Sequence, residues 1–299
     1  MARLKQAGAV VWAKTNLPRY AGDVQTFNDV FGTSNNPWDV TRSVGGSSGG
    51  SAGALAAGFT PLEVGSDIAG SIRNPAAMCG VVGHKPSYGL VSARGQIPGP
   101  PGTQTQADLA VVGPLARTVD DCSLGLDVLA GPDDWEATAW SLQLPPARRA
   151  SPQGLRVAVW ATDPYCPVDP EIEAAIEAMA RALESAGASI DDSARPAGFD
   201  FAKADATFQQ LLGGALAGSW SRAEIEDMAE LIGRGQAPDG GLGVAGAAQR
   251  HRSWLSANER RLQFRARGRE CFQQWDAVLA PVSPTVAIPH DHSLPRTRR

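Results

Sequence analysis

The spacing of apolar residues predicts helices and strands in an order that is typical of α/β proteins. The clearest stripe, at the spacing of one helix face, consists of Ile172, Ile176, Met179 and Leu183. Asp169 and Pro170 precede this stripe as a helix start, and Gly187 follows it as a stop. Short apolar runs at 155–160 and 188–190 predict strands on either side. Strand, helix and strand at these lengths indicate an α/β layer.

Shorter elements are predicted in the N-terminal half. We expect the end of a helix at 2–7, a buried strand at 9–12, loop-like chain at 16–50, a short helix at 51–57, a weak strand at 62–66, a loop at 98–105, a helix from Thr118 to about Gly131 and a surface excursion at 131–154. The segment 38–43 is a poor strand candidate. The Thr118 start resembles a capping box.

Beyond residue 200 the pattern is helical. Ser221 and Glu224 form a capping box, and a long helix is expected over 249–275. This helix carries seven arginines, which we interpret as a solvated face, with nucleic-acid binding as the alternative. An apolar run at 277–281 predicts a buried strand, and the tail at 295–299 offers nothing to a core.

Composition and charge narrow the class of protein. The 299 residues are 43% hydrophobic and 19% charged, with a net charge of −4, as in a globular enzyme without a nucleic-acid-binding surface. The four cysteines are widely spaced, which predicts reduced and mostly buried thiols instead of a disulfide frame or a zinc site. No apolar run approaches the length of a membrane span, so we expect no membrane partner and, by default, a cytoplasmic location.

A glycine- and serine-rich segment at 45–51, GGSSGGS, carries the first chemical signal. Successive backbone N–H groups in such a loop can bind an anion at the start of a helix. A phosphate loop is one interpretation, although this segment fits neither GxxxxGK[ST] nor GxGxxG. A nucleophile elbow is a second, because GGSSG fits G-x-S-x-G and His251, His290 and His292 follow later in the chain. The third interpretation uses a second Gly/Ser turn at 65–75.

Together the two turns resemble the amidase signature family. GGSSGGSAGALAAG is followed by GSDIAGSIRNPAAMCGVVGHKPSYG, with AGAVVWAKTN and FGTSNNPWD upstream. The similarity runs from about residue 3 to 89 and returns weakly at 276–284. The family usually has glycine at the position of Ala69, and a family cysteine matches Cys79, whose apolar neighbours favour packing.

In that family, catalysis uses a serine, a second serine after a cis peptide bond, and a lysine. The resemblance implies that Ser71 is the nucleophile and that Ser47, after a cis bond from Gly46, relays its proton to a neutral lysine. It also implies an oxyanion hole of backbone N–H groups. The implied oxyanion-hole residues are Ile68, Ala69, Gly70 and Ser71, and the supporting residues are Gly46, Ser48, Asp67 and Arg73.

No lysine of this chain matches the catalytic position. The family's lysine lies well upstream of the glycine cluster, which places it before Met1, while Lys5, Lys85 and Lys203 match nothing catalytic and Lys14 matches a different family position. We therefore expect a chain truncated at both ends. The expected fold is α/β, a mixed central sheet flanked by helices, in one partial domain at 1–299 with a catalytic core at 1–131 and a helical insertion at 200–275.

The function that the resemblance implies is hydrolysis of a small carboxylic amide through an acyl-Ser71 intermediate. No metal or organic cofactor is expected, and a homodimer is left open. Two alternatives remain. One is an ammonia-producing protein like the A subunit of glutamyl-tRNA amidotransferase, although Ile68, Ala69 and Asn74 depart from the DTGGSIRQPA that is typical there. The other is a catalytically inactive remnant.

Overall fold

The computed structural model describes residues 1–96, 102–235 and 242–292. Two compact units divide the chain: Met1–Leu144 with the segment from Ala287 onward, and Pro145–Val286. The predicted core at 1–131 lies in the first unit, and the predicted helical insertion at 200–275 lies in the second. The grouping of both into one domain stays a prediction.

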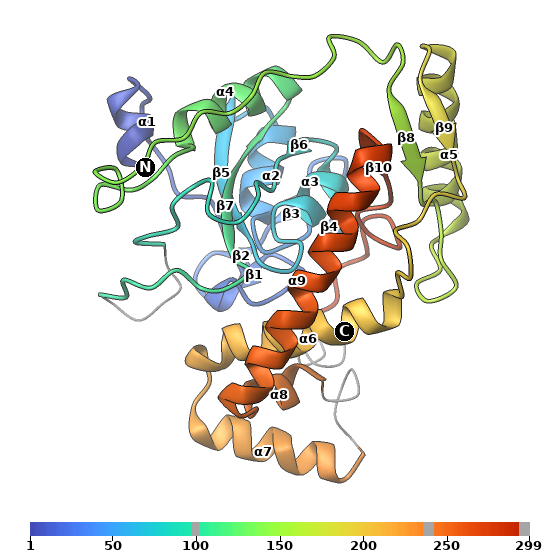
Figure 1. The fold of residues 1–299 in the computed structure, drawn as a ribbon. Coiled ribbons are helices and arrows are strands. Elements are labelled where there is room, and N and C mark those ends of the chain that lie inside the picture. The colour runs from blue at the N-terminus through green and yellow to red at the C-terminus, as the bar shows by residue number, and fades with distance from the viewer. Residues whose placement is uncertain (97–101, 236–241, 293–299) are drawn as a thin grey trace. The chain divides into compact units, whose positions relative to one another are not determined.

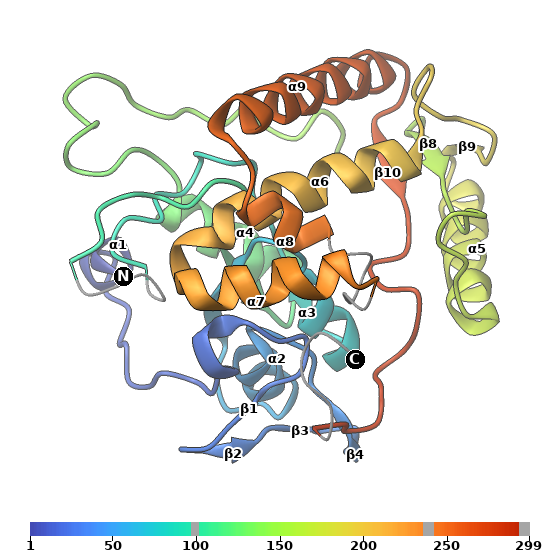
Figure 2. The same ribbon diagram turned by 90° about the horizontal axis from the view of Figure 1, so that it is seen from below.

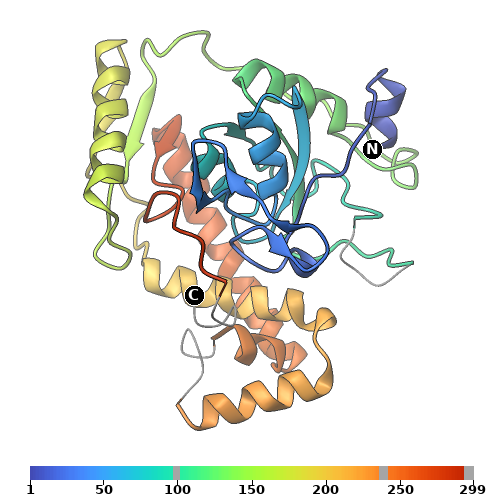
Figure 3. The ribbon, with the colours of Figure 1, turned by 180° about the vertical axis from the view of Figure 1, so that it is seen from behind.

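A three-stranded antiparallel sheet organises the first unit. Its strands are β5 (Leu62–Asp67), β7 (Val111–Ala116) and β6 (Val82–Gly83), with β7 in the middle. The register pairs Leu62 with Ala116 and Asp67 with Val111. The sheet stands between α4 (Val119–Leu129) and the helices α2 (Gly49–Ala56) and α3 (Arg73–Cys79), as Figure 1 and the view from behind in Figure 3 show.

Each face of this sheet has its own apolar cluster, because side chains alternate between the faces of a strand. On the α2 and α3 side, Leu55, Ile72 and Leu115 are completely buried. On the other side, Leu129 of α4 packs with Leu4 of α1 (Ala2–Gln6). The Thr118 hydroxyl caps α4 by accepting the Asp121 N–H at 3.1 Å, so the predicted helix start is confirmed.

Several short elements surround the sheet. They are η1 (Arg19–Ala21), the strand pair β1 (Phe27–Asn28) and β2 (Gly32–Thr33), and the pair β3 (Asn35–Asn36) and β4 (Asp39–Ser43). The segment 38–43, a poor strand candidate by sequence, does contain the strand β4. It pairs with β3, and Asn36 of β3 and Ser43 of β4 are both buried. The predicted buried strand at 9–12 is wrong: these residues are exposed and unpaired in the described chain, with Val10 85% exposed.

The second unit contains a parallel sheet covered by one helix. Its order is β10 (Ala277–Leu279), β8 (Arg156–Val159) and β9 (Ser189–Asp191), and α5 (Pro170–Ser185) packs on it. These elements confirm the predicted strand, helix and strand. Within the stripe, Ile176 and Leu183 meet the sheet, whereas Met179 is 52% exposed and Ala180 is buried in its place.

Four helices complete the second unit within the described residues: α6 (Phe201–Leu216), α7 (Arg222–Gly233), α8 (Leu242–Ala247) and α9 (His251–Gln274), with the single turn η2 (Ala217–Ser219) after α6. They confirm the helical region beyond residue 200, and α6 packs on both α8 and α9 (Figure 2). Ser221 and Glu224 form the predicted capping box. The α9 arginine face is mostly exposed, although Arg260 also donates to Gln210 of α6 at 2.7 Å.

The α/β class is therefore confirmed, with strands of both orientations in separate sheets of the two units. Among the described residues, the longest apolar stretches of helix are too short and too polar to cross a bilayer.

Candidate active site

The first Gly/Ser segment connects β4 to α2 and is buried throughout. The peptide bond between Gly46 and Ser47 is cis, as the resemblance predicts. A side chain at Gly46 would place its Cβ 2.5 Å from the Asp23 carbonyl oxygen, so only glycine fits at this close approach. Ser47 and Ser48 are each 2% exposed. The chain thus presents two consecutive serines from a tightly enclosed backbone.

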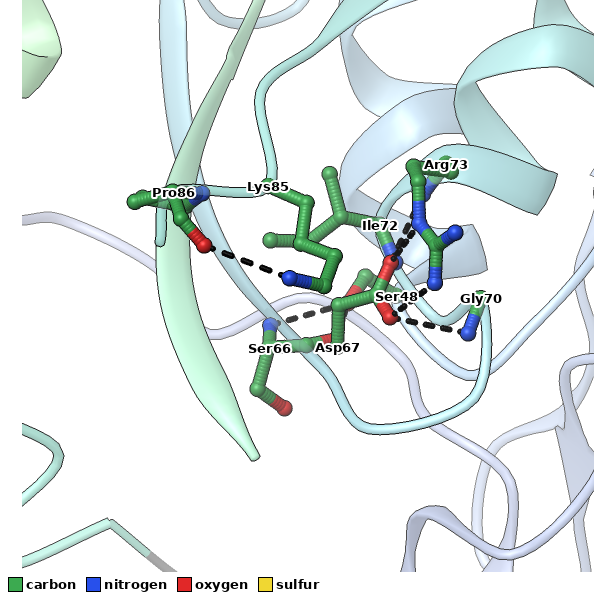
Figure 4. Close-up of polar contacts among 8 residues, drawn as sticks. All are labelled: Ser48, Ser66, Asp67, Gly70, Ile72, Arg73, Lys85 and Pro86. Carbon is green, nitrogen blue, oxygen red and sulfur yellow. Dashed lines mark hydrogen bonds and ion pairs between the residues drawn. The ribbon is translucent and has the colours of Figure 1, made fainter. Parts of the chain in front are cut away.

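The second Gly/Ser segment follows the end of β5 and leads into α3. Asp67, the last residue of β5, is completely buried and accepts the backbone N–H groups of Gly70 at 2.8 Å and Ile72 at 3.1 Å. Arg73 adds two side-chain hydrogen bonds to the same carboxylate, from Nε at 2.9 Å and Nη2 at 2.8 Å (Figure 4). The turn 68–72, which carries Ser71, is therefore wrapped around the Asp67 carboxylate and held by it.

The charge of Asp67 depends on these donors. Burial would raise the pKa of Asp67, but the Arg73 guanidinium and the N–H groups of Gly70 and Ile72 outweigh it and hold that pKa below its ordinary value of 3.8. Hydrogen bonding to Asp67 in turn raises the pKa of Arg73. The Asp67 carboxylate is buried, whereas the Arg73 side chain is 44% exposed, so this ion pair reaches from the interior of the turn to solvent.

Ser48 joins the two segments. Its backbone N–H donates to the Ser71 carbonyl oxygen at 3.0 Å. Its hydroxyl lies 3.3 Å from both the N–H and the carbonyl oxygen of Ser66, as donor to the one oxygen and acceptor from the N–H (Figure 4). A Cβ at Gly65 would lie 2.6 Å from this hydroxyl oxygen. These contacts bring the backbone of Ser47 and that of Ser71 into one site.

Comparison with known proteins identifies the family. The profile of the Amidase family matches residues 1–297. This chain belongs to the amidase signature family. A curated relative, the A subunit of glutamyl-tRNA(Gln) amidotransferase from Roseiflexus sp. (strain RS-1), is 34% identical over 97% of this chain and 62% of its own length. The corresponding protein of Alkaliphilus metalliredigens (strain QYMF) is 41% identical over 65% of this chain and 39% of its own length.

Solved structures of the amidase signature family are similar along nearly the whole chain. The A subunit of glutamyl-tRNA(Gln) amidotransferase from Thermotoga maritima has a TM-score of 0.76 at 28% identity, covering 97% of this chain and 61% of that one. A bacterial aryl acylamidase has a TM-score of 0.74 at 25% identity, covering 97% and 59%. This amidase signature chain therefore spans about three fifths of the length of the Roseiflexus and Thermotoga proteins.

The predicted oxyanion-hole residues of this amidase signature site lie together in the turn 68–72, with Ile68, Gly70 and Ser71 half-buried and Ala69 exposed. The N–H of Gly70 has Asp67 as its acceptor in this conformation. Glycine suits this position because its φ is +111°. The roles of Ser71, Ser47 and the oxyanion-hole residues stay predictions.

The remaining signature side chains serve packing or lie farther from the serines. Cys79 is buried, its thiol faces the Val44 carbonyl oxygen at 3.5 Å, and burial raises its pKa to about 12, in agreement with the predicted packing role. Among the described residues, no lysine is hydrogen-bonded to Ser47 or Ser71. Lys85 is half-buried beside Asp67 and Arg73, a placement that the sequence analysis missed.

Proposed function

We propose that Ser71 cleaves the C–N bond of a carboxylic amide through an acyl-serine intermediate. The Ser71 oxygen bonds to the amide carbon, and its proton passes to Ser47, which gives its own proton to a neutral lysine of the kind that the resemblance implies. The lysine then protonates the departing nitrogen, so ammonia or an amine leaves when the C–N bond breaks. Water attacks the acyl group in the second half and regenerates Ser71.

The observation that carries this proposal is the contact between the two Gly/Ser segments. The hydrogen bond from Ser48 N–H to the Ser71 carbonyl oxygen holds the residue beside Ser47 against the residue expected to be the nucleophile. Ser71 is half-buried, so a ligand can reach it, whereas Ser47 is enclosed, as suits a relay. An exposed serine without an ordered neighbour has no comparable means of activation.

The turn also supports stabilisation of negative charge on the carbonyl oxygen. Because Asp67 occupies the N–H of Gly70, we assign the oxyanion contacts to the N–H groups of Ile68, Ala69 and Ser71. Such fixed donors act strongly where water is excluded, and one donor typically contributes about 10²–10³ in kcat. The Asp67 carboxylate contributes indirectly, by holding the turn that aims these donors.

The sequence relatives favour a component of an amidotransferase over a stand-alone amidase. The A subunit of glutamyl-tRNA(Gln) amidotransferase matches over 97% of this chain at 34% identity. This similarity outweighs the departures at Ile68, Ala69 and Asn74 from the sequence typical of that subunit. On this second candidate function, the amide is a glutamine side chain, and the released ammonia passes to an acceptor held by partner subunits.

An active-site probe tests the shared chemistry. In a protein extended upstream by a segment that supplies the lysine, a fluorophosphonate should label Ser71 equally in the wild type and in the Ser123→Ala control. It should leave the Ser71→Ala variant unlabelled, with the adduct mapped by mass spectrometry; Ser123 is an exposed residue of α4. An adduct on Ser47 would support the nucleophile elbow instead. A folded protein that takes no label would favour the inactive remnant.

Substrate comparison separates the two candidate functions. Ammonia release from glutamine that rises when partner subunits co-purify would support the amidotransferase assignment. Release of an aryl amine from simple anilides, with no response to glutamine, would support the stand-alone amidase.

A further inference from the structure

Lys85 is held in place by its neighbours on both sides. The N–H of His84 donates to the Pro114 carbonyl oxygen of β7 at 3.0 Å, and Pro86 is completely buried. The side chain of Lys85 is half-buried, whereas the chain's other lysines, Lys5, Lys14 and Lys203, are exposed. Ordering a lysine side chain and withdrawing it partly from water both cost free energy. Charged neighbours of Lys85 can offset this cost.

The segment that carries Lys85 packs directly on the turn that carries Ser71. A Cβ at Gly83 would lie 2.9 Å from the Ile72 side chain and 3.1 Å from the Ile72 carbonyl oxygen. A Cβ at Gly113, in the neighbouring strand, would lie 2.1 Å from the His84 carbonyl oxygen and 3.2 Å from the Ile72 side chain. Both glycines thus permit a backbone approach that places Lys85 beside the residue after Ser71.

The side chain of Lys85 lies beside the charged groups of that turn. In Figure 4 it is drawn between Pro86 and the Asp67–Arg73 pair, with its nitrogen turned toward Pro86. It donates a hydrogen bond to the Pro86 carbonyl oxygen at 3.3 Å, and the described residues place no carboxylate within salt-bridge distance of it. Burial lowers the pKa of Lys85, and so does the Arg73 cation, while Asp67 opposes this shift. The pKa of His84 is also lowered, by burial and by Lys85.

We propose that Lys85 is a positioning residue, a second cation that works with Arg73 to keep the Asp67 carboxylate charged and oriented toward the N–H groups of the Ser71 turn. Arg73 bonds the carboxylate directly and Lys85 acts through its charge. The Asp67 carboxylate, kept charged by both cations, holds the turn so that its N–H groups can face the negative oxygen that forms during attack by Ser71. Only this catalytic consequence rests on the proposed function.

The proposal is tested first by a cycle of variants at Lys85 and Asp67. The readout is the rate of Ser71 modification by a fluorophosphonate, with its rate constant and half-saturating concentration measured separately at pH 7. Lys85→Met should lower the rate constant about tenfold and leave half-saturation unchanged, whereas Lys85→Arg should stay within about twofold of the wild type. In an Asp67→Asn background, Lys85→Met should add less than a further twofold, because Lys85 acts through Asp67.

A matched control is Lys203→Met, which removes an exposed lysine that pairs with Asp200 at 3.0 Å and should change nothing. An unchanged rate in Lys85→Met overturns the proposal. Equal losses in Lys85→Met and Lys85→Arg, or additive losses with Asp67→Asn, would also overturn it, since they point to shape or to amine chemistry instead of charge.

A second readout does not require Ser71 to react, so it separates this proposal from the proposed function. Competitive acetylation of the folded protein, read by mass spectrometry across pH 7–11, reports the titration of each lysine. Asp67→Asn should lower the pKa of Lys85, so that Lys85 reacts at lower pH, because a neighbouring negative charge is lost. Arg73→Met should raise the pKa of Lys85 and move its reaction to higher pH, because a neighbouring positive charge is lost. The reaction of Lys203 should change in neither variant. Identical Lys85 titrations in all three proteins would show that the charges are not coupled and would refute the proposal even if Ser71 is the nucleophile.

Discussion

Replacing Asp67 with asparagine should destabilise the first unit strongly. The carboxylate is completely buried and accepts hydrogen bonds from the N–H groups of Gly70 and Ile72 and from two nitrogens of Arg73. An amide of the same shape keeps one acceptor oxygen and turns the other into an NH₂ group that faces donors. At least one donor, such as the N–H of the buried Ile72, is then left without an acceptor.

The size of the loss follows from these contacts. An orphaned buried donor costs about 1–3 kcal/mol, and a hydrogen bond to a charged group contributes about 1.5–3 kcal/mol. Breaking a fully buried ion pair costs about 3–5 kcal/mol, but the Arg73 side chain is 44% exposed and can turn to water, which lowers its share. We therefore expect a loss of about 3 kcal/mol in the free energy of unfolding at pH 7.

Urea unfolding followed by circular dichroism measures this loss, and hydrogen exchange of the amides of Gly70 and Ile72 locates it. A matched control is Asp200→Asn, because Asp200 also pairs with a cation and accepts the backbone N–H of Lys203, but at a partly exposed helix start where asparagine caps equally well. The control should lose less than about 0.5 kcal/mol. A loss below about 1 kcal/mol in Asp67→Asn, with unchanged amide exchange, would refute the role of Asp67 in the turn.

The contribution of Asp67 to stability should depend on pH. Because the pKa of Asp67 is held below 3.8 in the folded chain, its contribution to stability is present above the unfolded pKa and is lost as the pH falls through the folded one. The Asp67→Asn variant should therefore lose less stability than the wild type on acidification.

Two further predictions concern packing near the site. Gly46→Ala should lower the free energy of unfolding by more than about 2 kcal/mol, as overpacking does, because its Cβ would lie 2.5 Å from the Asp23 carbonyl oxygen. The control Gly218→Ala, which has open space around it, should not lower it. Thermal melts compare the two variants, and equal melting temperatures would contradict the close approach at Gly46. Alkylation of the folded protein at pH 8 should modify the exposed Cys166 well before the buried Cys79, whose thiol pKa is raised to about 12. If mass spectrometry found Cys79 modified first, the apolar cluster around Cys79 would be open to solvent.

Local signals in the sequence were sufficient for elements with their own start and stop residues. Thr118 and Ser221 cap their helices by side-chain hydrogen bonds within one turn, so neither depends on the rest of the fold. The stripe of α5 was placed correctly in its period but one residue off at Met179, since Ala180 allows the helix to approach the sheet more closely.

Elements that depend on distant partners were not predicted. The strand β7 contains Gly113 and Pro114, which read as a turn, yet glycine is required there by the approach of the His84 carbonyl oxygen. The short helix α3 contains Pro75 and is completed by Asp67, whose carboxylate accepts the N–H groups at its start. The buried strand expected at 9–12 has the right apolar composition, but the described chain provides no strand to pair with it.

The candidate site shows the same division. The order of residues in the two Gly/Ser segments was enough to locate the cis bond at Gly46, because the resemblance rests on a local motif. The roles of Ser71 and Ser47 stay predictions. The occupation of the Gly70 N–H by Asp67 and the approach of Lys85 depend on side-chain directions and sheet pairing. Neither leaves a periodic trace in the sequence.

Trapping of the acyl intermediate tests whether Ser71 is the nucleophile. The folded protein, extended upstream by a segment that supplies the lysine, is mixed with an activated ester such as a p-nitrophenyl ester. It is quenched in acid and mapped by tandem mass spectrometry, with Ser71→Ala and Ser123→Ala variants treated in parallel. We expect one acyl group on Ser71, retained in Ser123→Ala and absent from Ser71→Ala. An acyl group on Ser47, or a folded protein in which Ser71 stays unmodified, would contradict it.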